Sequence, residues 1–528
     1  MNYLKNIFNN NDSQSLQIRY SLLFVLLLIL VSLFYGYHEI LFFPPQSIHV
    51  WRQCDCTSMA LLYAEHGMHF FKPEMHNLHA DGQTTGFAVG EFPIIYYFVA
   101  ILYKLFGHHD FLLRATDLFI FFAGLFFMFK LIYLVSRDYF YAILFPILLF
   151  TSPLLVYYAN NFLPEVPSLG LTLIGWYFFF KMRQQYQSRY LYLFIFFLTF
   201  ATLIKVTSGI SLILTFSLLF FESIKLIKLK KDKNIFRQTL IGFLAFAGSI
   251  IIIIAWYLFA IKYNQDHSTI YFRTGIVGFW QTNAKDAKSV SEMFINNWKF
   301  FIFNDSVYLL LGIIFLLIII CSRNTFLILM NLLMIAGIAG FVSLWYGLLH
   351  QHDYYFAPLL IMAAMLFISF SEAGNIRFPK IFHHPILKIV FLVLLIINIS
   401  YASGKVKRRY IEFSDRQNKV ELYDIQNFLD SLKIEKDAKI ICTPDLTPNH
   451  MLYLLNRQGW SDLYGMNNDS LKVLDHIRHG AKYLFVHHNI PKENYDLNHF
   501  IDSWLGEKGF LQVYKLKGYE EIVNTKKE

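Results

Sequence analysis

Charged side chains are scarce in this chain. Aspartate, glutamate, lysine and arginine together make up 16% of its 528 residues, whereas 56% of the residues are hydrophobic and 18% are aromatic. So little charge excludes an arrangement as one soluble core, and the composition therefore predicts an integral membrane protein. The net charge of +9 is better explained by basic loops that face anionic lipid than by nucleic-acid binding.

Cysteine is scarce as well, with four residues in the whole chain. Cys54 and Cys56 are two positions apart, a spacing at which a disulfide would be strained, and Cys321 and Cys442 are isolated. The sequence therefore indicates neither a disulfide framework nor a thiolate metal site. It also contains no internal repeat.

Long apolar runs recur between residues 18 and 403, each with about the 17 to 25 residues that a helix needs to cross the hydrocarbon core. We expect about 11 transmembrane helices, the first of them a retained anchor that leaves the N-terminus inside. With this topology, the inside loops carry 16 lysine and arginine residues in 63 positions and the outside loops carry 8 in 132, in agreement with the positive-inside rule. The expected spans are 18–37, 112–134, 140–158, 166–182, 190–205, 207–228, 237–262, 306–322, 324–348, 354–372 and 385–403.

The large first external loop, residues 38–111, contains one apolar segment, Phe92–Phe106, which is short for a span. Its tyrosines and Lys104 suit a helix lying in the membrane interface, where aromatic rings and a lysine amine are both stable. A short, tilted span is the alternative.

The chain changes character after residue 403, where charged residues are spread throughout and the apolar stretches become short. We expect a polytopic membrane domain over residues 1–403 and a small soluble α/β domain over 404–528, which the predicted topology places on the outside. Helical periodicity predicts a helix over Val420–Leu432, and three apolar or alternating runs predict strands. These runs are Lys439–Cys442, Lys482–Val486 and Phe510–Tyr514. The domain has no phosphate-binding glycine loop, H-E-x-x-H or nucleophile elbow, so its sequence assigns it no activity.

Polar residues gather in the predicted outside loops. Trp51–Cys56 places Arg52 and Asp55 just after the first span, and the turn before the fourth span holds Glu165 between two prolines. An acid at this point also suits the positive end of a helix, so a helix-start role for Glu165 is an equal alternative. Four histidines in the first loop, His66, His69, His76 and His79, could bind a metal together with Glu74 and Asp81. Because no supporting ligand pattern is visible, simple polar loop residues are the preferred interpretation, and no cofactor is predicted.

The order of five external stretches resembles the polyprenyl-phosphate-sugar-dependent glycosyltransferases of the GT-C fold, in the branch of the protein O-mannosyltransferases and the lipid A aminoarabinose transferase. The resemblance covers roughly residues 18–403. Many relatives have paired acids in the first motif, whereas Cys56 follows Asp55 here, which weakens a mechanism that needs two adjacent carboxylates. The matching stretches are Trp51–Asp55, Gly90–Tyr97, Tyr158–Pro167, Leu203–Thr207 and His352–Pro358.

This resemblance implies an inverting transfer of a sugar from a polyprenyl-phosphate donor to a lipid, glycan or protein acceptor. Asp55 would be the general base, and Lys205 would stabilise the leaving phosphate. Arg52 and Lys72 are secondary phosphate candidates, and Glu165 would orient a sugar through its hydroxyl groups.

The remaining candidates have weaker support. Glu91 would belong to the site or simply begin the interfacial helix, and His352 and Tyr354 would contact sugar or phosphate or form an aromatic belt. Lys205 itself could be a lysine that reaches the interface from a helix end. We expect Asp55, Glu165 and Lys205 to converge at one membrane-level cavity.

The resemblance is closest to bacterial members, which implies an inner membrane with the site and the C-terminal domain on the periplasmic side. Three other classes are compatible with the sequence, and one of them is a nonenzymatic scaffold with a sensory outer domain, which a substitution of Asp55 without functional effect would favour. A transporter would place ionisable residues and broken helices near the bilayer midplane, and an O-antigen ligase or polymerase would have its key loop late in the chain. The notable charges lie at the outer ends of the predicted spans and the two halves show no similarity, which counts against the transporter. The early position of the Asp55 loop counts against the ligase or polymerase.

Overall fold

Helices dominate the structure, a computed structural model that describes residues 2–185, 187–228, 239–270, 272, 276–412, 419–463, 469–487 and 497–525. The chain divides into two compact units. The helical unit consists of Met1–Leu41, Arg114–Trp256 and Gly275–Arg408. The mixed unit consists of Phe42–Leu113, Tyr257–Thr274 and Arg409–Glu528.

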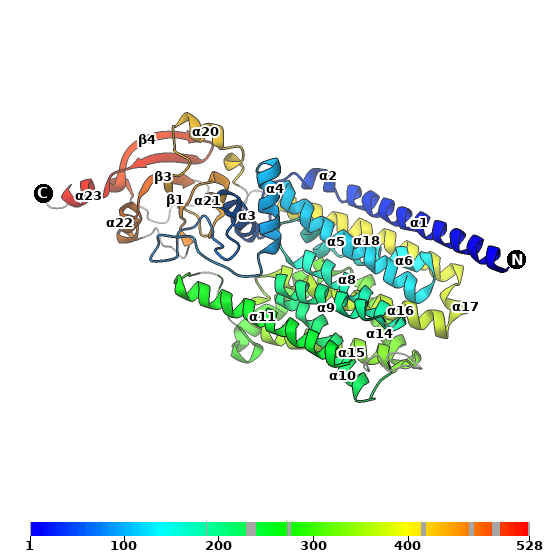
Figure 1. The fold of residues 1–528 in the computed structure, drawn as a ribbon. Coiled ribbons are helices and arrows are strands. Elements are labelled where there is room, and N and C mark those ends of the chain that lie inside the picture. The colour runs from blue at the N-terminus through cyan, green and yellow to red at the C-terminus, as the bar shows by residue number, and fades with distance from the viewer. Residues whose placement is uncertain are drawn as a thin grey trace. The chain divides into compact units, whose positions relative to one another are not determined.

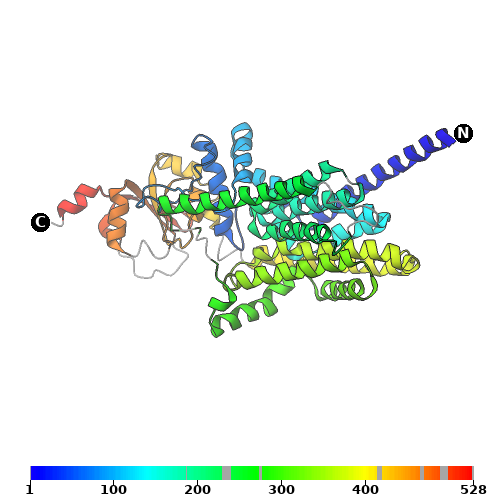
Figure 2. The same ribbon diagram turned by 60° about the horizontal axis from the view of Figure 1, so that its bottom comes forward.

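The long helices of the helical unit run side by side in both views (Figures 1 and 2). Each of the eleven predicted spans coincides with helix in the structure, which confirms the fold class of a polytopic α-helical membrane protein. The main helices are α1 (Asn2–Phe34), α5 (Phe111–Ser136), α6 (Tyr139–Leu149), α7 (Pro153–Ala159), α8 (Glu165–Gln185), α9 (Ser188–Ile204), α10 (Gly209–Ser223), α11 (Thr239–Asp266), α12 (Ala284–Met293), α14 (Asp305–Cys321), α15 (Thr325–Leu344), α16 (Ile361–Arg377) and α18 (Pro385–Glu412).

Seven stretches of helix in the described residues are long and apolar enough to cross a membrane, or up to nine if each of two bent pairs counts as one span. The expected total of eleven therefore stays a prediction. The span predicted over 140–158 is interrupted, because α6 and α7 meet at an angle of 78°. The break lies where Ser152 caps α7 by accepting a hydrogen bond from the backbone N–H of Leu155, and Pro153 begins the new helix.

Two glycines let α5 and α8 pack backbone against backbone. A Cβ atom on Gly124 would lie 2.5 Å from the Cα of Gly170, and a Cβ on Gly170 would lie 2.7 Å from the carbonyl oxygen of Ile120. Small residues at such crossings are how membrane helices gain close packing without a hydrophobic driving force between them. This contact fixes α8, and Glu165 is the first residue of α8.

The mixed unit is built on a five-stranded sheet in the order β2-β1-β3-β5-β4. The strands β1, β2 and β3 are parallel, whereas β5 is antiparallel to both β3 and β4. Their bounds are β1 (Lys439–Thr443), β2 (Gly459–Trp460), β3 (Ala481–His487), β4 (Ile501–Lys508) and β5 (Leu511–Leu516). All three predicted strands are present. The predicted helix over 420–432 is shorter, since α20 covers only Gln426–Ser431 after the 3₁₀ turn η8 (Val420–Leu422).

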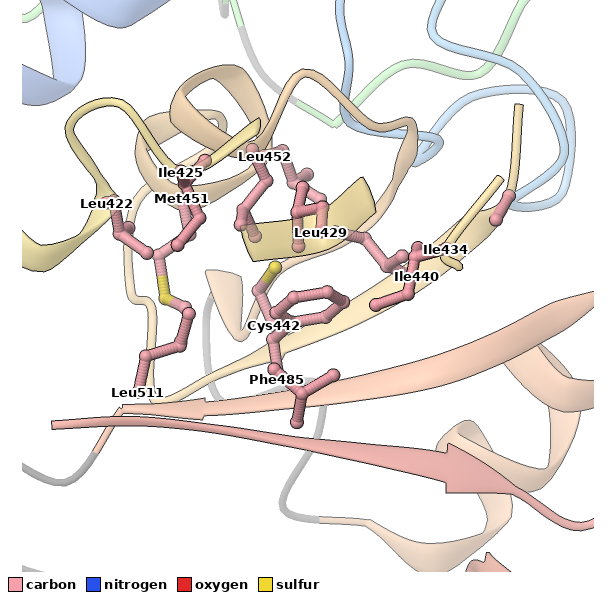
Figure 3. Close-up of a cluster of buried hydrophobic side chains, with 13 residues drawn as sticks. Leu422, Ile425, Leu429, Ile434, Ile440, Cys442, Met451, Leu452, Phe485 and Leu511 are labelled. Atoms are coloured by element: carbon pink, nitrogen blue, oxygen red, sulfur yellow. The ribbon is translucent and has the colours of Figure 1, made fainter. Parts of the chain in front are cut away.

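Both faces of this sheet are covered, which explains the nearly continuous apolar sequences of β1 and β3. One face packs against α20 and α21 (His450–Leu455) through Cys442, Phe485 and the surrounding side chains of Figure 3. The other face packs against α22 (Ser470–Arg478) through Ile441 and Leu484. The α/β class predicted for the C-terminal segment is thus present as a sheet with helices on both faces.

The first external loop belongs to the same compact unit as this sheet. Asn77 pairs with Gly459 in a parallel bridge at the edge of β2, where the backbone N–H of Leu78 donates to the Gly459 carbonyl. The Leu78 side chain then joins the apolar cluster of the second face. Gly459 is required here, because a Cβ atom on it would lie 1.9 Å from the carbonyl oxygen of Ile440. The loop thus covers part of an otherwise open sheet edge with an isolated β-bridge.

Replacing Gly170 by alanine should lower the melting temperature of the detergent-solubilised protein, because the new methyl group would meet backbone that cannot move aside. Overpacking of this kind costs about 1 to 3 kcal/mol. The matched control is Gly248→Ala in α11, where a Cβ meets nothing within 4 Å. The close-packing argument fails if both variants melt at the wild-type temperature.

Candidate functional site

A buried ion pair lies at one end of the helical unit. Glu165, the first residue of α8, is fully buried, and its carboxylate lies 2.6 Å from the Nζ atom of Lys205. Lys205 follows the last residue of α9 in extended backbone and precedes the 3₁₀ turn η1 (Val206–Ser208). The helix-start position predicted for Glu165 is confirmed, and the structure gives the acid a specific partner as well. A charge pair this deeply buried is expensive to desolvate, so an exposed helix-start residue does not account for it.

Aromatic rings surround the Lys205 amine. The ring centroids of Tyr354 and Tyr355 lie 5.8 and 4.9 Å from Nζ, within the range of cation–π attraction. Tyr158 donates a hydrogen bond of 2.6 Å to the carboxylate of Asp353, which fixes the 3₁₀ turn η6 (Asp353–Phe356) against α7. His352 lies at the start of this turn, with its ring 5.3 Å from that of Tyr354. The predicted stretches 158–167, 203–207 and 352–358 therefore meet within one unit.

A second carboxylate near this pair was missed by the sequence analysis. Asp117 lies in α5, one helical turn after Arg114, and both residues are buried. Arg114 donates a hydrogen bond of 2.5 Å to the carbonyl of Asn160 and stacks on the ring of Phe162. The signal was present in the sequence, because an acid and an arginine inside a predicted span mark a functional region by default.

An apolar cavity of about 500 Å³ lies in the same unit. Its wall includes Phe294 beyond α12, and Phe356, Leu359 and Leu360 from the turns that precede α16. Tyr346 contributes one of the few polar groups of the lining. A concave, apolar space of this size fits a hydrocarbon ligand.

Asp55 lies in the mixed unit, on α3 (Val50–Glu65), and is 3% exposed. Burial raises the pKa of its carboxyl group to about 6, against the opposing effects of the nearby Arg52 charge and of a hydrogen bond from Asn449. A carboxylate with such a pKa is ionised at neutral pH and remains a better proton acceptor than an ordinary aspartate. This is the property that a general base needs.

The hydrogen bond to Asp55 comes from the C-terminal segment. Asn449 donates from Nδ2 to Oδ1 of Asp55 over 2.8 Å, while its Oδ1 atom accepts from the backbone N–H of Asn77 over 3.0 Å. The second bond fixes which end of the amide faces Asp55. Asn449 occupies the N-cap position of α21, where asparagine commonly caps its own helix, but its side chain makes no cap bond here. No sequence signal singled out this residue.

Buried Arg52 pairs with the partly buried Glu91 in the mixed unit. One guanidinium nitrogen of Arg52 lies 2.6 Å from both carboxylate oxygens of Glu91. The Arg52 guanidinium also lies over the ring of Phe272. Glu91 therefore holds Arg52 in place and offsets its charge, which is more than the helix-start role considered for it. Lys72 is exposed in the loop.

The first-loop histidines have separate partners. His66 pairs with Glu74 over 2.6 Å, and His76 bonds to Ser58 and Asn456, with burial lowering the pKa of its ring to about 4. Asp81 pairs with His267, His69 is exposed, and His79 is buried. Among the described residues, no group of three or more histidine, cysteine, aspartate or glutamate side chains is arranged to hold a metal ion.

The predicted site residues thus fall into two sets. Glu165, Lys205, His352 and Tyr354 lie together in the helical unit, whereas Arg52, Asp55 and Glu91 lie in the mixed unit. The expected convergence of Asp55 with Glu165 and Lys205 stays a prediction.

Solved structures similar to this chain include an oligosaccharyltransferase and an arabinofuranosyltransferase. ArnT from Cupriavidus metallidurans has a TM-score of 0.57 and 11% identity over 94% of this chain and 98% of its own, and its complex with undecaprenyl phosphate has a TM-score of 0.56. The chain has the GT-C fold. The Archaeoglobus fulgidus oligosaccharyltransferase has a TM-score of 0.51 and 12% identity, over 88% of this chain and 69% of its own. The arabinofuranosyltransferase AftD from Mycobacteria has a TM-score of 0.51 and 10% identity, over 94% of this chain and 40% of its own. No protein-family model and no curated protein sequence matches the chain.

Asp55→Asn should stabilise the protein more at pH 7.5 than at pH 5. The folded pKa of Asp55 is raised above its value of 3.8 in the unfolded chain, so the carboxyl favours folding at low pH and that contribution is lost as the pH rises through about 6. Thermal melting of both proteins at the two pH values measures the difference. Asp266→Asn, which alters an exposed carboxylate, serves as the control and should change melting equally at both pH values. An equal effect of Asp55→Asn at both pH values would contradict the raised pKa.

Proposed function

We propose that this protein is an inverting glycosyltransferase that moves a sugar from a polyprenyl-phosphate donor to a lipid, glycan or protein acceptor at the outer face of a membrane. The GT-C fold supports this reaction class. One similar structure, ArnT, is bound to undecaprenyl phosphate, and a complex of the archaeal oligosaccharyltransferase contains dolichol phosphate. A bacterial inner membrane with the site on the periplasmic side fits the predicted topology.

The observation that carries the proposal is the position of the apolar cavity next to a buried cation. Phe356, Leu359 and Leu360 line the cavity, while Tyr354, two residues before Phe356, lies over the Lys205 amine. The turn η1 that follows Lys205 also contacts η7 (Pro358–Leu360), which contributes to the cavity wall. A hydrocarbon chain ending in a phosphate matches both parts, because its tail would occupy the cavity and its anionic head would reach the amine.

Lys205 would stabilise the leaving group. As the bond between the anomeric carbon and the phosphate oxygen breaks, negative charge builds up on the phosphate, and a fixed amine in a water-poor site lowers the energy of that state. Lysine carries three N–H donors, so the amine can bind phosphate while it still contacts Glu165. Glu165 would hold the amine in position and accept a hydrogen bond from a sugar hydroxyl.

Asp55 would take the proton of the acceptor nucleophile as it attacks the anomeric carbon. Attack on the face opposite the departing phosphate makes a single displacement, which inverts the anomeric centre. Asn449 and Arg52 both favour the ionised form of Asp55, so the base is charged before substrate binds. The mechanism requires this base and the Lys205 amine to flank one anomeric carbon.

Asp55→Asn and Lys205→Met should each abolish transfer of radiolabelled sugar from a panel of undecaprenyl-phosphate-linked sugars into cell-envelope extract. A general base contributes about 100-fold or more to the rate, and loss of a buried cation facing the leaving group should be at least as damaging. Lys288→Met is the control, because this lysine is exposed and pairs with Glu292 one turn away.

The outcomes separate the rival classes. Transfer by Asp55→Asn at the wild-type rate would overturn Asp55 as the base. Uptake of a labelled solute into proteoliposomes, with no transfer from any donor, would favour the transporter instead.

Asn449→Ala should reduce transfer and shift the acidic limb of the pH profile upward. Removing the hydrogen bond raises the pKa of Asp55 above about 6, so a smaller fraction of the base is ionised at a given pH. Comparing kcat/KM from pH 5 to pH 9 distinguishes a positioning role from a loss of folding. A variant that only folds poorly would lose activity equally at every pH.

A further inference from the structure

Several buried polar atoms next to the Glu165–Lys205 pair have no hydrogen-bond partner among the described residues. Asp117 lacks one at both carboxylate oxygens, and Glu165 has only its ion pair with Lys205. Four further atoms have no hydrogen-bond partner in the described part of the chain. They are both side-chain polar atoms of Asn160, Nδ2 of Asn161 and the Thr207 hydroxyl oxygen. All five side chains are at most 4% exposed.

These residues share one neighbourhood within the helical unit. Arg114, one turn before Asp117 on α5, donates to the carbonyl of Asn160, and Glu165 and Arg114 are the charges that act on Asp117. Thr207 is two residues after Lys205, and the next residue, Ser208, bonds to Ser168 in the first turn of α8. The unsatisfied atoms therefore surround the buried ion pair.

The chemistry of these atoms selects a ligand rich in hydroxyl groups. An unpartnered buried polar group costs about 1 to 3 kcal/mol, so a cluster of them is unfavourable unless a ligand completes it. The Glu165 carboxylate, held in its ion pair with Lys205, accepts hydrogen bonds only and repels a phosphate, and the carboxyl group of Asp117 beside it offers two further polar oxygens. Amide nitrogens of Asn160 and Asn161 donate. A hydroxyl group both donates and accepts, so a sugar ring satisfies both kinds of atom.

We infer that Asp117, together with Asn160, Asn161 and Thr207, forms the subsite that binds the hydroxyl groups of the donor sugar. This inference rests on the proposed function, because it places the sugar next to the amine that binds its phosphate. Asp117 is a specificity-determining residue in this subsite. A sugar that lacks the hydroxyl facing Asp117 leaves a buried carboxylate unpaired, and sites of this kind reject such analogues strongly.

The first test uses stability without ligand. Asp117→Leu should melt at or above the wild-type temperature in detergent, because the substitution removes a buried carboxyl group whose oxygens have no hydrogen-bond partner among the described residues. The matched control is Asp353→Leu, which removes an acid bonded to Tyr158 and should melt at a lower temperature. A lower melting temperature for Asp117→Leu would show that Asp117 supports the fold and would overturn the inference.

The second test measures binding by thermal shift in the absence of acceptor. Undecaprenyl phosphate alone should stabilise wild type and Asp117→Leu equally, since the subsite does not contact the phosphate. At least one undecaprenyl-phosphate-linked hexose or pentose from a panel should stabilise wild type further, and Asp117→Leu should lose that additional shift. Loss of the shift from undecaprenyl phosphate itself in wild type would count against the proposed function. A normal shift from undecaprenyl phosphate, with no further gain from any sugar, would overturn the subsite alone.

Discussion

The Glu165–Lys205 ion pair is the interaction around which the polar end of the helical unit is built. It joins the first turn of α8 to the end of α9, and the Lys205 amine brings in the tyrosines of the turn before α16. Three segments that are far apart in sequence therefore share one buried charge pair. Removing one partner would leave the other charge buried and unpaired, which lowers stability far more than replacing both residues by apolar ones. The helices around it are consequently held in register by a contact that packing alone would not require.

In the mixed unit, the important constraint is that the carboxylate of Asp55 is buried and yet ionised at neutral pH. Asp55 sits on a helix whose residues are mostly buried, and burial alone would favour its neutral form. Arg52 and Asn449 counter that effect. Asn449 is held in place by the first loop, because Asn77 donates to its side chain and forms a β-bridge with the edge of the C-terminal sheet. The C-terminal segment, to which the sequence assigned no activity, thus supplies a direct hydrogen bond to the candidate base.

Local patterns in the sequence were enough for most of the fold. Each predicted apolar run is helical in the structure, and each of the three runs predicted as strands is a strand. These predictions succeed because the length and periodicity of apolar residues indicate which side chains are buried. The break between α6 and α7 was not predicted, because hydropathy stays high across the apolar run that contains Ser152 and Pro153. These two residues are nevertheless typical of a helix start. For the site, Glu165 and Lys205 could be predicted because they are charges in short turns. Asn449 could not, because its importance comes from a contact with a residue 394 positions away.

One set of buried polar atoms without a hydrogen-bond partner among the described residues lies around the Glu165–Lys205 pair, on Asp117, Asn160, Asn161 and Thr207. Other such atoms lie elsewhere in the described residues, for example on His79, Asn331 and Thr443. The set around the ion pair stands out because it lies beside a buried amine, and because the turn after that amine contacts the η7 turn of the apolar cavity wall. A binding site places such atoms where a ligand's own polar groups will lie. A lipid phosphate that carries a sugar has an apolar tail, an anionic centre and a polyhydroxylated head, and the helical unit presents a matching environment for each of the three.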